Sequence, residues 1–243
     1  MKIILCFLIS VFSFASKQKV TLGTFLIPRY VKSSTEGEFI KLVTEISEEL
    51  DIDIEIVILP PKRTVMAFEN KKVDGYFPAL DVFHEEDEIY KSTPYYYKKD
   101  FLFYRENEEI SLKEKNQICF THGYPYKKDI INQKNITQVF ASSDEACLEM
   151  LSRKRVDGFI CEGLTGISAI EKLNQNDINM SPIILSSQDV YFAFSRDDRG
   201  RELSEEFTKV INSMRDNGRL KSLFAPASTK LRELISDFDP TAK

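Results

Sequence analysis

The stretch Asn70–Phe77 (NKKVDGYF) recurs 83 residues later as Arg153–Ile160 (RKRVDGFI). Each copy ends a helical pattern with basic residues and leads through Val-Asp-Gly to an aromatic or aliphatic strand, as expected where a helix gives way to a strand. The repetition suggests two lobes with the same architecture, and a pair of α/β lobes is a common way to form a cleft. Chance similarity is the alternative, because helix-to-strand turns often have this composition. The surrounding residues favour the first interpretation.

Strand and helix patterns alternate in the same order around both copies. In the first half, strands are predicted at 20–25, 52–58 and 73–77, with helices at 39–50 and 62–71. In the second half, strands are predicted at 117–121, 136–140 and 156–161, with a helix at 124–131 and another opened by a capping box of Ser142 and Glu145. The order β-α-β-α-β in each half favours parallel sheets.

Four further elements are predicted outside these repeats. They are a strand at 101–104, a helix at 164–173, a strand at 190–195 and a long amphipathic helix that ends near Gly218. The last two follow the second repeat, so the chain returns to a strand and a helix after both halves are complete.

The composition of the 243-residue chain is that of a globular protein, with 42% hydrophobic and 29% charged residues. The formal net charge is −5 and charges of both signs are interspersed, which argues against nucleic acid as a partner. The two histidines, His84 and His122, are far apart and no Cys-x-x-Cys pair occurs, so we expect no metal site. The sequence contains no phosphate-binding loop or dinucleotide fingerprint, so we also expect no cofactor.

The N-terminus has the features of a secretory signal. Lys2 precedes an apolar run from Ile3 to Phe14, and Ser13-Phe14-Ala15 places small residues where a signal peptidase reads them. The run is too short for a comfortable membrane span. We therefore predict that residues 1–15 are a cleaved signal peptide and that the protein is periplasmic. A buried first strand or helix is the alternative.

Removal of this signal leaves three cysteines, Cys119, Cys147 and Cys161. An odd number allows at most one internal disulfide and leaves at least one thiol. Cys119 and Cys161 lie in apolar, strand-like runs, so small core residues are the favoured interpretation. A bond between these two is the alternative, and nothing in the sequence selects it.

The order of segments carries a family resemblance. A β-α-β-α-β lobe is followed by Ser92-Thr93-Pro94-Tyr95, a second such lobe, Val190–Ser195 (VYFAFS) and a helix that ends in Asn217-Gly218-Arg219-Leu220. Over roughly residues 19 to 225 this resembles the bacterial extracellular solute-binding proteins of family 3, which are type II periplasmic binding proteins that serve polar amino acid ABC importers. The resemblance implies an α/β fold with two Rossmann-like lobes joined by a two-strand hinge.

The resemblance also implies domain limits and partners. Lobe 1 would comprise residues 16–97 plus 191–243, and lobe 2 residues 98–190, with crossings near 97–101 and 188–191. A small polar ligand, amino-acid-like or related, would bind between the lobes, and hinge bending would close them over it. The protein would act without catalysis, as a monomer, and would pass its ligand to the membrane subunits of an ABC importer or to a sensor.

Five candidate binding residues lie in the first lobe. Arg63 begins a predicted helix, where anions are favoured, and an arginine can bind a carboxylate through two hydrogen bonds, although a solvated arginine is as good an interpretation. The resemblance implies that Tyr30 forms an aromatic wall and that Pro78 and Ala79 form the pocket floor, without the hydroxyls often present in the family. Tyr95 lies at the crossing, where it would line the cleft or pack within the hinge.

Four more candidates lie in the second lobe. Tyr124 belongs to a Gly-Tyr-Pro-Tyr segment that follows a strand, and its backbone amides could hold an acidic group. Ser142 and Ser143 could face the ligand, although helix capping alone explains Ser142. Glu162 matches the family's carboxylate for the ligand's α-amino group, which is usually Asp, and a surface acid at a strand end is the alternative.

One position departs from the family pattern. Amino-acid binders of this family carry an arginine seven residues before the serine of the Ser-Pro-Tyr-like segment, whereas this chain has Glu85 there. A glutamate would repel a ligand carboxylate. Two other functions stay open. One is a periplasmic enzyme on the same scaffold, similar to cyclohexadienyl dehydratases, with Glu162 as its acid, although such an enzyme must also hold a substrate carboxylate and the usual arginine is absent. The other is an interaction module that has lost ligand binding.

Overall fold

The computed structural model describes residues 17–84, 88–225 and 240–242. The predicted signal peptide and Glu85 lie outside these residues. The strands are β1 (Lys19–Thr24), β2 (Asp53–Ile58), β3 (Gly75–Ala79), β4 (Tyr90–Lys91), β5 (Tyr96–Arg105), β6 (Asn116–Thr121), β7 (Ile136–Ala141), β8 (Gly158–Glu162), β9 (Ile178–Met180) and β10 (Ser186–Phe194). The helices are α1 (Glu38–Leu50), α2 (Pro61–Glu69), a 3-10 turn η1 (Asp81–Phe83), α3 (Lys128–Ile131), α4 (Asp144–Ser152), α5 (Gly163–Leu173), α6 (Asp198–Asp216) and α7 (Arg219–Leu223).

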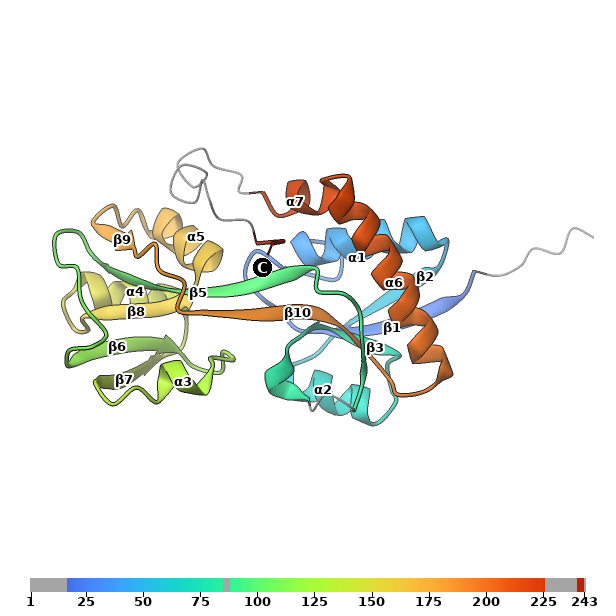
Figure 1. Ribbon diagram of the computed structural model, residues 1–243, viewed down its shortest axis with the longest axis horizontal. Coiled ribbons are helices and arrows are strands. Elements are labelled where there is room, and N and C mark those ends of the chain that lie inside the picture. Colours follow the sequence, from blue (N-terminus) through green and yellow to red (C-terminus); the bar gives the residue numbers. More distant parts are fainter. Residues whose placement is uncertain (1–16, 85–87, 226–239, 243) are drawn as a thin grey trace, which may run out of the picture.

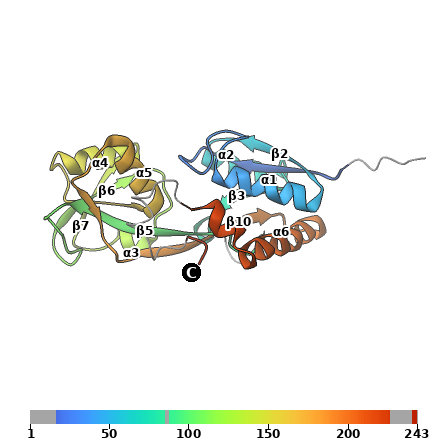
Figure 2. The same cartoon turned by 90° about the horizontal axis from the view of Figure 1, so that it is seen from above.

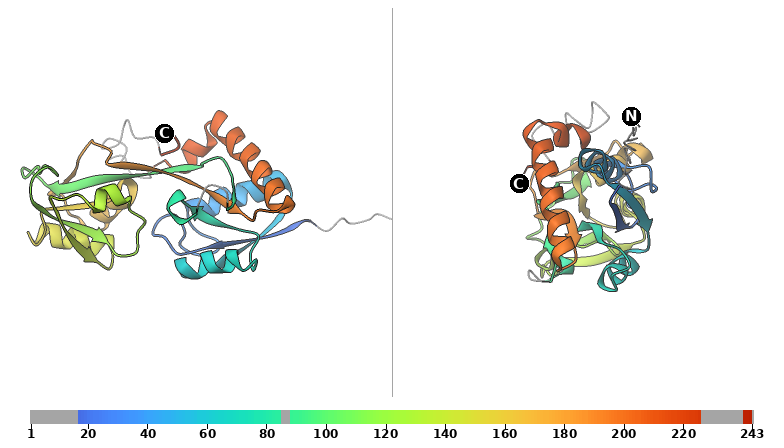
Figure 3. Two further views of the ribbon diagram at one scale, coloured as in Figure 1. Left: turned by 60° about the horizontal axis from the view of Figure 1, so that its bottom comes forward. Right: turned by 90° about the vertical axis from the view of Figure 1, so that its right-hand side faces the viewer.

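These elements form two lobes that face each other across a pair of long strands (Figures 1 and 2). The first lobe contains β1–β4 with α1, α2, α6 and α7, and the second contains β6–β9 with α3–α5. β5 and β10 run from one lobe into the other (Figure 3). The mixed α/β, two-lobed fold confirms the fold class predicted from the sequence. The residue limits of the two domains stay a prediction.

Both lobes repeat one strand order. In the first lobe β1 lies between β2 and β3 and pairs with both in parallel. In the second lobe β6 lies between β7 and β8, again in parallel. The helices α1 and α2, and α4 in the second lobe, provide the crossovers that parallel pairing requires.

The sheets of the two lobes are linked because β5 and β10 change partners along their length. Residues 186–190 of β10 pair antiparallel with residues 96–100 of β5, whereas residues 191–194 pair with β3 and β4. β5 in turn pairs with β8 from Asp100 onward. The hydrogen-bonded path is therefore continuous from β2 to β7, but each lobe has its own sheet on its own side of this crossing.

The Val-Asp-Gly copies perform the same structural task in each lobe. The Asp74 carboxylate accepts a hydrogen bond from the Thr21 backbone N–H at 2.7 Å, and the Asp157 carboxylate accepts one from the Gln117 N–H at 2.7 Å. In both cases the Asp lies just before the start of its own strand, and its side chain accepts a hydrogen bond from a backbone N–H of the neighbouring parallel strand. The repeated sequence thus corresponds to repeated hydrogen bonding.

Both helices before these turns also end in the same way. Lys71 and Lys154 have positive φ angles of 55° and 57°. Their backbone N–H groups donate to the carbonyls of Phe68 and Leu151, three residues earlier. A left-handed residue at this position is a common helix ending, and here it occurs without glycine.

The structure corrects two details of the second lobe. The helix predicted at 124–131 covers only α3, Lys128–Ile131, because Pro125 disfavours helical geometry in the residue before it. The N-cap of α4 is Ser143, whose Oγ accepts from the Ala146 N–H at 3.2 Å, and not Ser142. The predicted cap was therefore wrong by one residue.

Residues 240–242 lie against the crossing strands. The Tyr97 N–H donates to the Pro240 carbonyl at 2.7 Å, and the Lys99 ammonium donates to the Ala242 carbonyl at 2.7 Å. No helix in the described part of the chain is long and apolar enough to cross a membrane.

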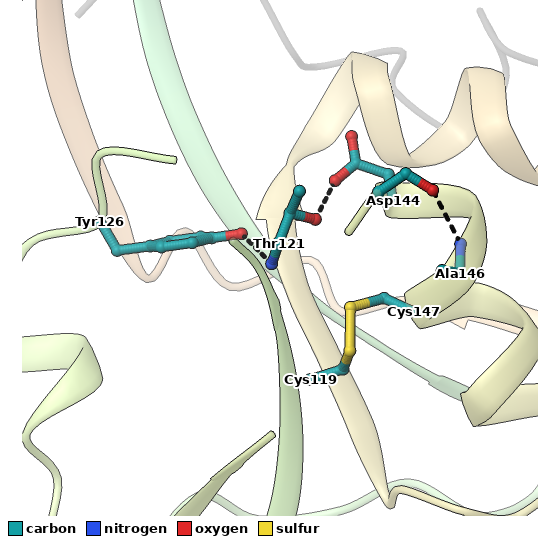
Figure 4. Close-up of a disulfide and its surroundings, with 7 residues drawn as sticks. Cys119, Thr121, Tyr126, Asp144, Ala146 and Cys147 are labelled. Carbon is teal, nitrogen blue, oxygen red and sulfur yellow. Dashed lines mark hydrogen bonds between the residues drawn. A yellow bond between two sulfur atoms is a disulfide. The ribbon is translucent and has the colours of Figure 1, made fainter. Parts of the chain in front are cut away.

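A disulfide joins Cys119 of β6 to Cys147 of α4, with their Cα atoms 5.6 Å apart (Figure 4). Cys161 keeps a free thiol and is buried. The interpretation as a small core residue therefore holds for Cys161, whereas the bond forms between Cys119 and Cys147 and not between Cys119 and Cys161. The bond closes 28 residues of the second lobe.

We expect the two repeated glycines to respond differently to Gly→Ala substitution. A Cβ at Gly75 would lie 2.6 Å from the Ala193 carbonyl oxygen, whereas the three atoms nearest to a Cβ at Gly158 would be methyl carbons of Leu102, Ile110 and Ile118, at 2.8 to 3.0 Å. Side-chain ends can move and the backbone of β10 cannot, so Gly75→Ala should cost about 1–3 kcal/mol of unfolding free energy and Gly158→Ala less. Urea denaturation measures both, and equal losses would contradict this explanation.

We also expect reduction to destabilise the protein by about 3–4 kcal/mol, the chain-entropy value for a loop of this length. The measurement is chemical denaturation with and without dithiothreitol. A Cys119→Ala/Cys147→Ala double variant should be insensitive to the reductant. If the double variant responds as strongly as the wild type, the disulfide does not stabilise the fold.

Candidate functional site

A cavity of about 260 Å³ lies between the two lobes, beside the crossing strands. This is just below the range of roughly 300–1,000 Å³ that is usual for ligand pockets. The first lobe contributes mainly apolar side chains, among them Leu26, Ile27, Phe39, Pro78, Leu80 and Phe83. The crossing strand β5 and the second lobe contribute polar groups, among them Lys98 of β5 and Tyr124, Asp144, Glu162 and Thr165 of the second lobe. The cavity therefore has one apolar side and one side with charges.

A larger and more open groove of about 870 Å³ adjoins this cavity and shares Asp144 and Thr165 with it. Its borders carry charged residues that are already paired, such as Arg29 with Glu38 at 2.8 Å. We consider the smaller cavity the better candidate site because it is lined by aromatic and apolar side chains that can remove a small molecule from water.

Two tyrosines and one carboxylate connect the lobes at the base of the cavity. The Tyr30 hydroxyl, from the first lobe, donates to Glu162 Oε2 at 2.9 Å, and the Tyr96 hydroxyl, from the crossing, donates to Glu162 Oε1 at 2.7 Å. The two hydroxyl oxygens are 2.7 Å apart. Burial raises the pKa of both phenols well above the ordinary value, so they stay protonated and act as donors.

Glu162 is also the N-cap of α5. Its carboxylate accepts from the Leu164 N–H at 3.1 Å, the Thr165 N–H at 2.8 Å and the Thr165 hydroxyl at 2.7 Å. With the two tyrosines, five donors of the protein itself therefore surround this carboxylate. A capping acid at the positive end of a helix is a stabilising arrangement without any ligand.

Asp144, the first residue of α4, is the second acid at the cavity. Only 4% of it is exposed, and it accepts a hydrogen bond from the Thr121 hydroxyl (Figure 4). It accepts a second one from the Tyr124 hydroxyl at 3.3 Å. The pKa of its carboxyl is raised to about 6, mainly by burial. The hydrogen bonds from the two hydroxyls lower this pKa, and the nearby carboxylates of Glu145 and Glu162 raise it. Asp144 is thus a buried acid with few partners.

Lys98 supplies positive charge to the cavity wall. Its ammonium lies 2.5 Å from Asp100 Oδ1 and 5.3 Å from the centre of the Tyr126 ring. Asp100 is fully buried and also accepts from the Ser186 hydroxyl at 2.6 Å. The charge of Lys98 is therefore largely balanced by Asp100.

The structure brings four of the nine predicted site residues to the cavity. Tyr30, Pro78, Tyr124 and Glu162 line it, whereas Arg63, Ala79, Tyr95, Ser142 and Ser143 do not. Arg63 and Ser142 are exposed, and Ser143 serves as the cap of α4. Tyr95 is fully buried against Phe39 and Phe192, so it packs within the crossing and does not line the cavity.

Sequence reasoning missed most of the other lining residues, and three of them, Asp144, Tyr126 and Lys98, show why. Asp144 was treated only as part of a helix start, although it follows strand β7 at the edge where the carboxyl ends of parallel strands meet. Tyr126 lay within a predicted helix. Lys98 lies in a polar stretch of β5 with no motif, and its role becomes visible only once β5 pairs with its neighbours.

Comparison with known protein families identifies the chain. The model of the bacterial extracellular solute-binding proteins, family 3, matches residues 28–226. The chain therefore belongs to this family, as predicted from the order of its segments. No curated protein matches the chain significantly in sequence.

Solved structures with the same fold include a ligand-binding core, an arginine-bound protein and a periplasmic domain. The ligand-binding core of GluR0 from Nostoc punctiforme in complex with L-glutamate has a TM-score of 0.69 and 15% identity, covering 84% of this chain and 97% of that one. An arginine-bound mutant of ArgBP from T. maritima has a TM-score of 0.63 and 17% identity, covering 81% and 95%. The periplasmic domain of BvgS from B. pertussis has a TM-score of 0.69 and 17% identity, covering 90% of this chain and 47% of that one. At such identities these likenesses establish the fold alone.

We expect Asp144→Asn to stabilise the ligand-free protein at pH 8. The folded-state pKa of about 6 lies above the value of about 3.9 in an unfolded chain. The free energy of unfolding therefore falls as the pH rises between these two values, because ionised Asp144 is less favourable in the folded protein than in the unfolded chain. An uncharged side chain removes that cost, and the gain should be about 1–3 kcal/mol at pH 8 and should vanish near pH 4.

Denaturation at the two pH values measures this gain. The neighbouring Glu145→Gln is the matched control, because Lys172 holds the pKa of Glu145 below its usual value and its loss should give no gain at pH 8. A loss of stability in Asp144→Asn at pH 8 would contradict the prediction.

Proposed function

We propose that this protein is a periplasmic solute-binding protein that captures a small polar ligand in the cavity between its lobes and delivers it to an ABC importer or a sensor. The observation that supports this most directly is the cavity itself. Side chains from both lobes and from the crossing strands line it, so a ligand there touches both lobes. Ligand binding then favours the closed arrangement to the extent that these contacts exceed those with water.

The same geometry argues against the two alternatives. A dehydratase-like enzyme would need Glu162 free to give a proton to its substrate, but five internal donors already surround that carboxylate. A module that has lost ligand binding would be expected to fill the space with side chains, yet a cavity of about 260 Å³ remains. Binding without chemistry fits both observations.

The fold comparisons are compatible with either kind of partner. One structural neighbour is a histidine kinase sensor domain with similarity to periplasmic binding proteins, and another is the substrate-binding protein of an amino acid ABC transporter. We propose that the protein acts as a monomer, since one chain supplies both sides of the cavity.

The test is native mass spectrometry of freshly purified protein, followed by thermal shifts with a panel of small polar solutes. We expect a ligand of the wild type to bind roughly tenfold more weakly, about 1.4 kcal/mol, in Tyr124→Ala, which removes an aromatic wall. Tyr104→Ala is the control, because Tyr104 is also partly buried in the second lobe but does not line the cavity. The proposal fails if no solute binds, or if both variants bind as the wild type does.

A further inference from the structure

The charges at the cavity are unbalanced. Among its lining residues, all within the described part of the chain, Lys98 is the only one with a permanent positive charge, whereas Asp144 and Glu162 are acids. Lys98 lies 2.5 Å from the buried Asp100, which balances it. A ligand therefore enters a site in which negative charge is in excess.

The two acids differ in how much they can offer a ligand. Each oxygen of Glu162 already accepts at least two hydrogen bonds from the protein. Each oxygen of Asp144 accepts one, and the bond from Tyr124 is long at 3.3 Å. A carboxylate can accept about four hydrogen bonds, so Asp144 is the acid with acceptor capacity left for a ligand.

The walls beside Asp144 suit a cation with an apolar body. Tyr124 and Tyr126 both line the cavity, with their ring centres 6.4 Å apart, and tyrosine ring faces attract positive charge. The protein demonstrates this with its own side chain, because the Lys98 ammonium is 5.3 Å from the centre of the Tyr126 ring. Opposite them, Leu26 and Phe83 are substantially exposed for large apolar residues, at 63% and 40%, and both line the cavity.

A carboxylate on the ligand would find no unshared permanent positive charge among the described lining residues. The arginine considered from the sequence, Arg63, is exposed on α2 and does not line the cavity. Lys98 would have to share its ammonium between the ligand and Asp100, while Asp144 and Glu162 would repel the incoming anion. The site can thus satisfy a positive group better than a negative one.

From this geometry we infer that the cavity takes a small organic cation with an apolar body, whose charged nitrogen binds the Asp144 carboxylate, and not an acid or a zwitterionic α-amino acid. This inference rests on the proposed function, since it names the ligand class of the same cavity. It also gives a role to a buried acid that has only two neutral hydrogen-bond partners.

Isothermal titration calorimetry with probes of one shape and different charge tests the inference. The probes are 2-phenylethylamine and benzyltrimethylammonium as cations, 3-phenylpropionate as the anion, phenylalanine as the zwitterion and 2-phenylethanol as the neutral analogue. We expect at least one cation to bind the wild type roughly tenfold or more tightly than the other three probes, a difference of about 1.4 kcal/mol.

The matched variants are Asp144→Asn and Glu145→Gln, two adjacent carboxylates of which only the first lines this cavity. Asp144→Asn should lose at least tenfold in affinity for the cation, and Glu145→Gln should bind as the wild type does. Circular dichroism and thermal denaturation establish that both variants are folded.

The outcomes separate the inference from the proposed function. Tighter binding of the anion or the zwitterion, unchanged cation binding by Asp144→Asn, or no cation binding at millimolar concentration overturns the inference. The proposed function stands in those cases if native mass spectrometry or the wider solute panel finds a ligand that Tyr124→Ala weakens. The proposed function fails if no solute of any charge binds, or if Tyr124→Ala and Tyr104→Ala both bind the solute as the wild type does.

Discussion

The antiparallel pairing of β5 with β10 determines how the two lobes, and with them the cavity, are positioned. Five residue pairs, from Ser186 with Asp100 to Val190 with Tyr96, hold the two lobes together. Beyond them each strand turns to partners in one lobe only. The cavity residues Tyr96, Val190 and Glu162 belong to this crossing or pair directly with it. Any relative movement of the lobes must therefore be accommodated next to the site.

The two acids of the cavity illustrate how stability and recognition are divided. Glu162 caps α5 and receives the hydroxyls of Tyr30 and Tyr96, so it contributes to the folded structure without a ligand. Asp144 carries a buried charge that only two hydroxyls support. Residues that lower stability while facing a cavity are typical of functional sites. This contrast between the two acids is a better guide to the ligand than the match of Glu162 to the family pattern.

Most of the fold could be predicted from the sequence, because it depends on local patterns. The repeated Val-Asp-Gly turns, the alternating strands and the order of the segments all depend on residues close in the chain. The site depended on contacts between distant residues: Tyr30 and Glu162 meet across 132 positions. The pairing of Cys119 with Cys147 likewise depends on how α4 packs on β6. Arg63 was considered only because it lies at the start of a helix. That position does not tell whether the side chain of Arg63 faces the cavity or the solvent.

The tyrosine-rich wall of the cavity also has an optical consequence. The chain contains ten tyrosines and no tryptophan, and four of these tyrosines, at positions 30, 96, 124 and 126, line the cavity. Phenol emission is weakened where the hydroxyl contacts a carboxylate, as it does in Tyr30 and Tyr96 with Glu162. The intrinsic ultraviolet fluorescence of this protein is therefore free of indole background, and a large share of its emitters surrounds the space that a ligand would occupy.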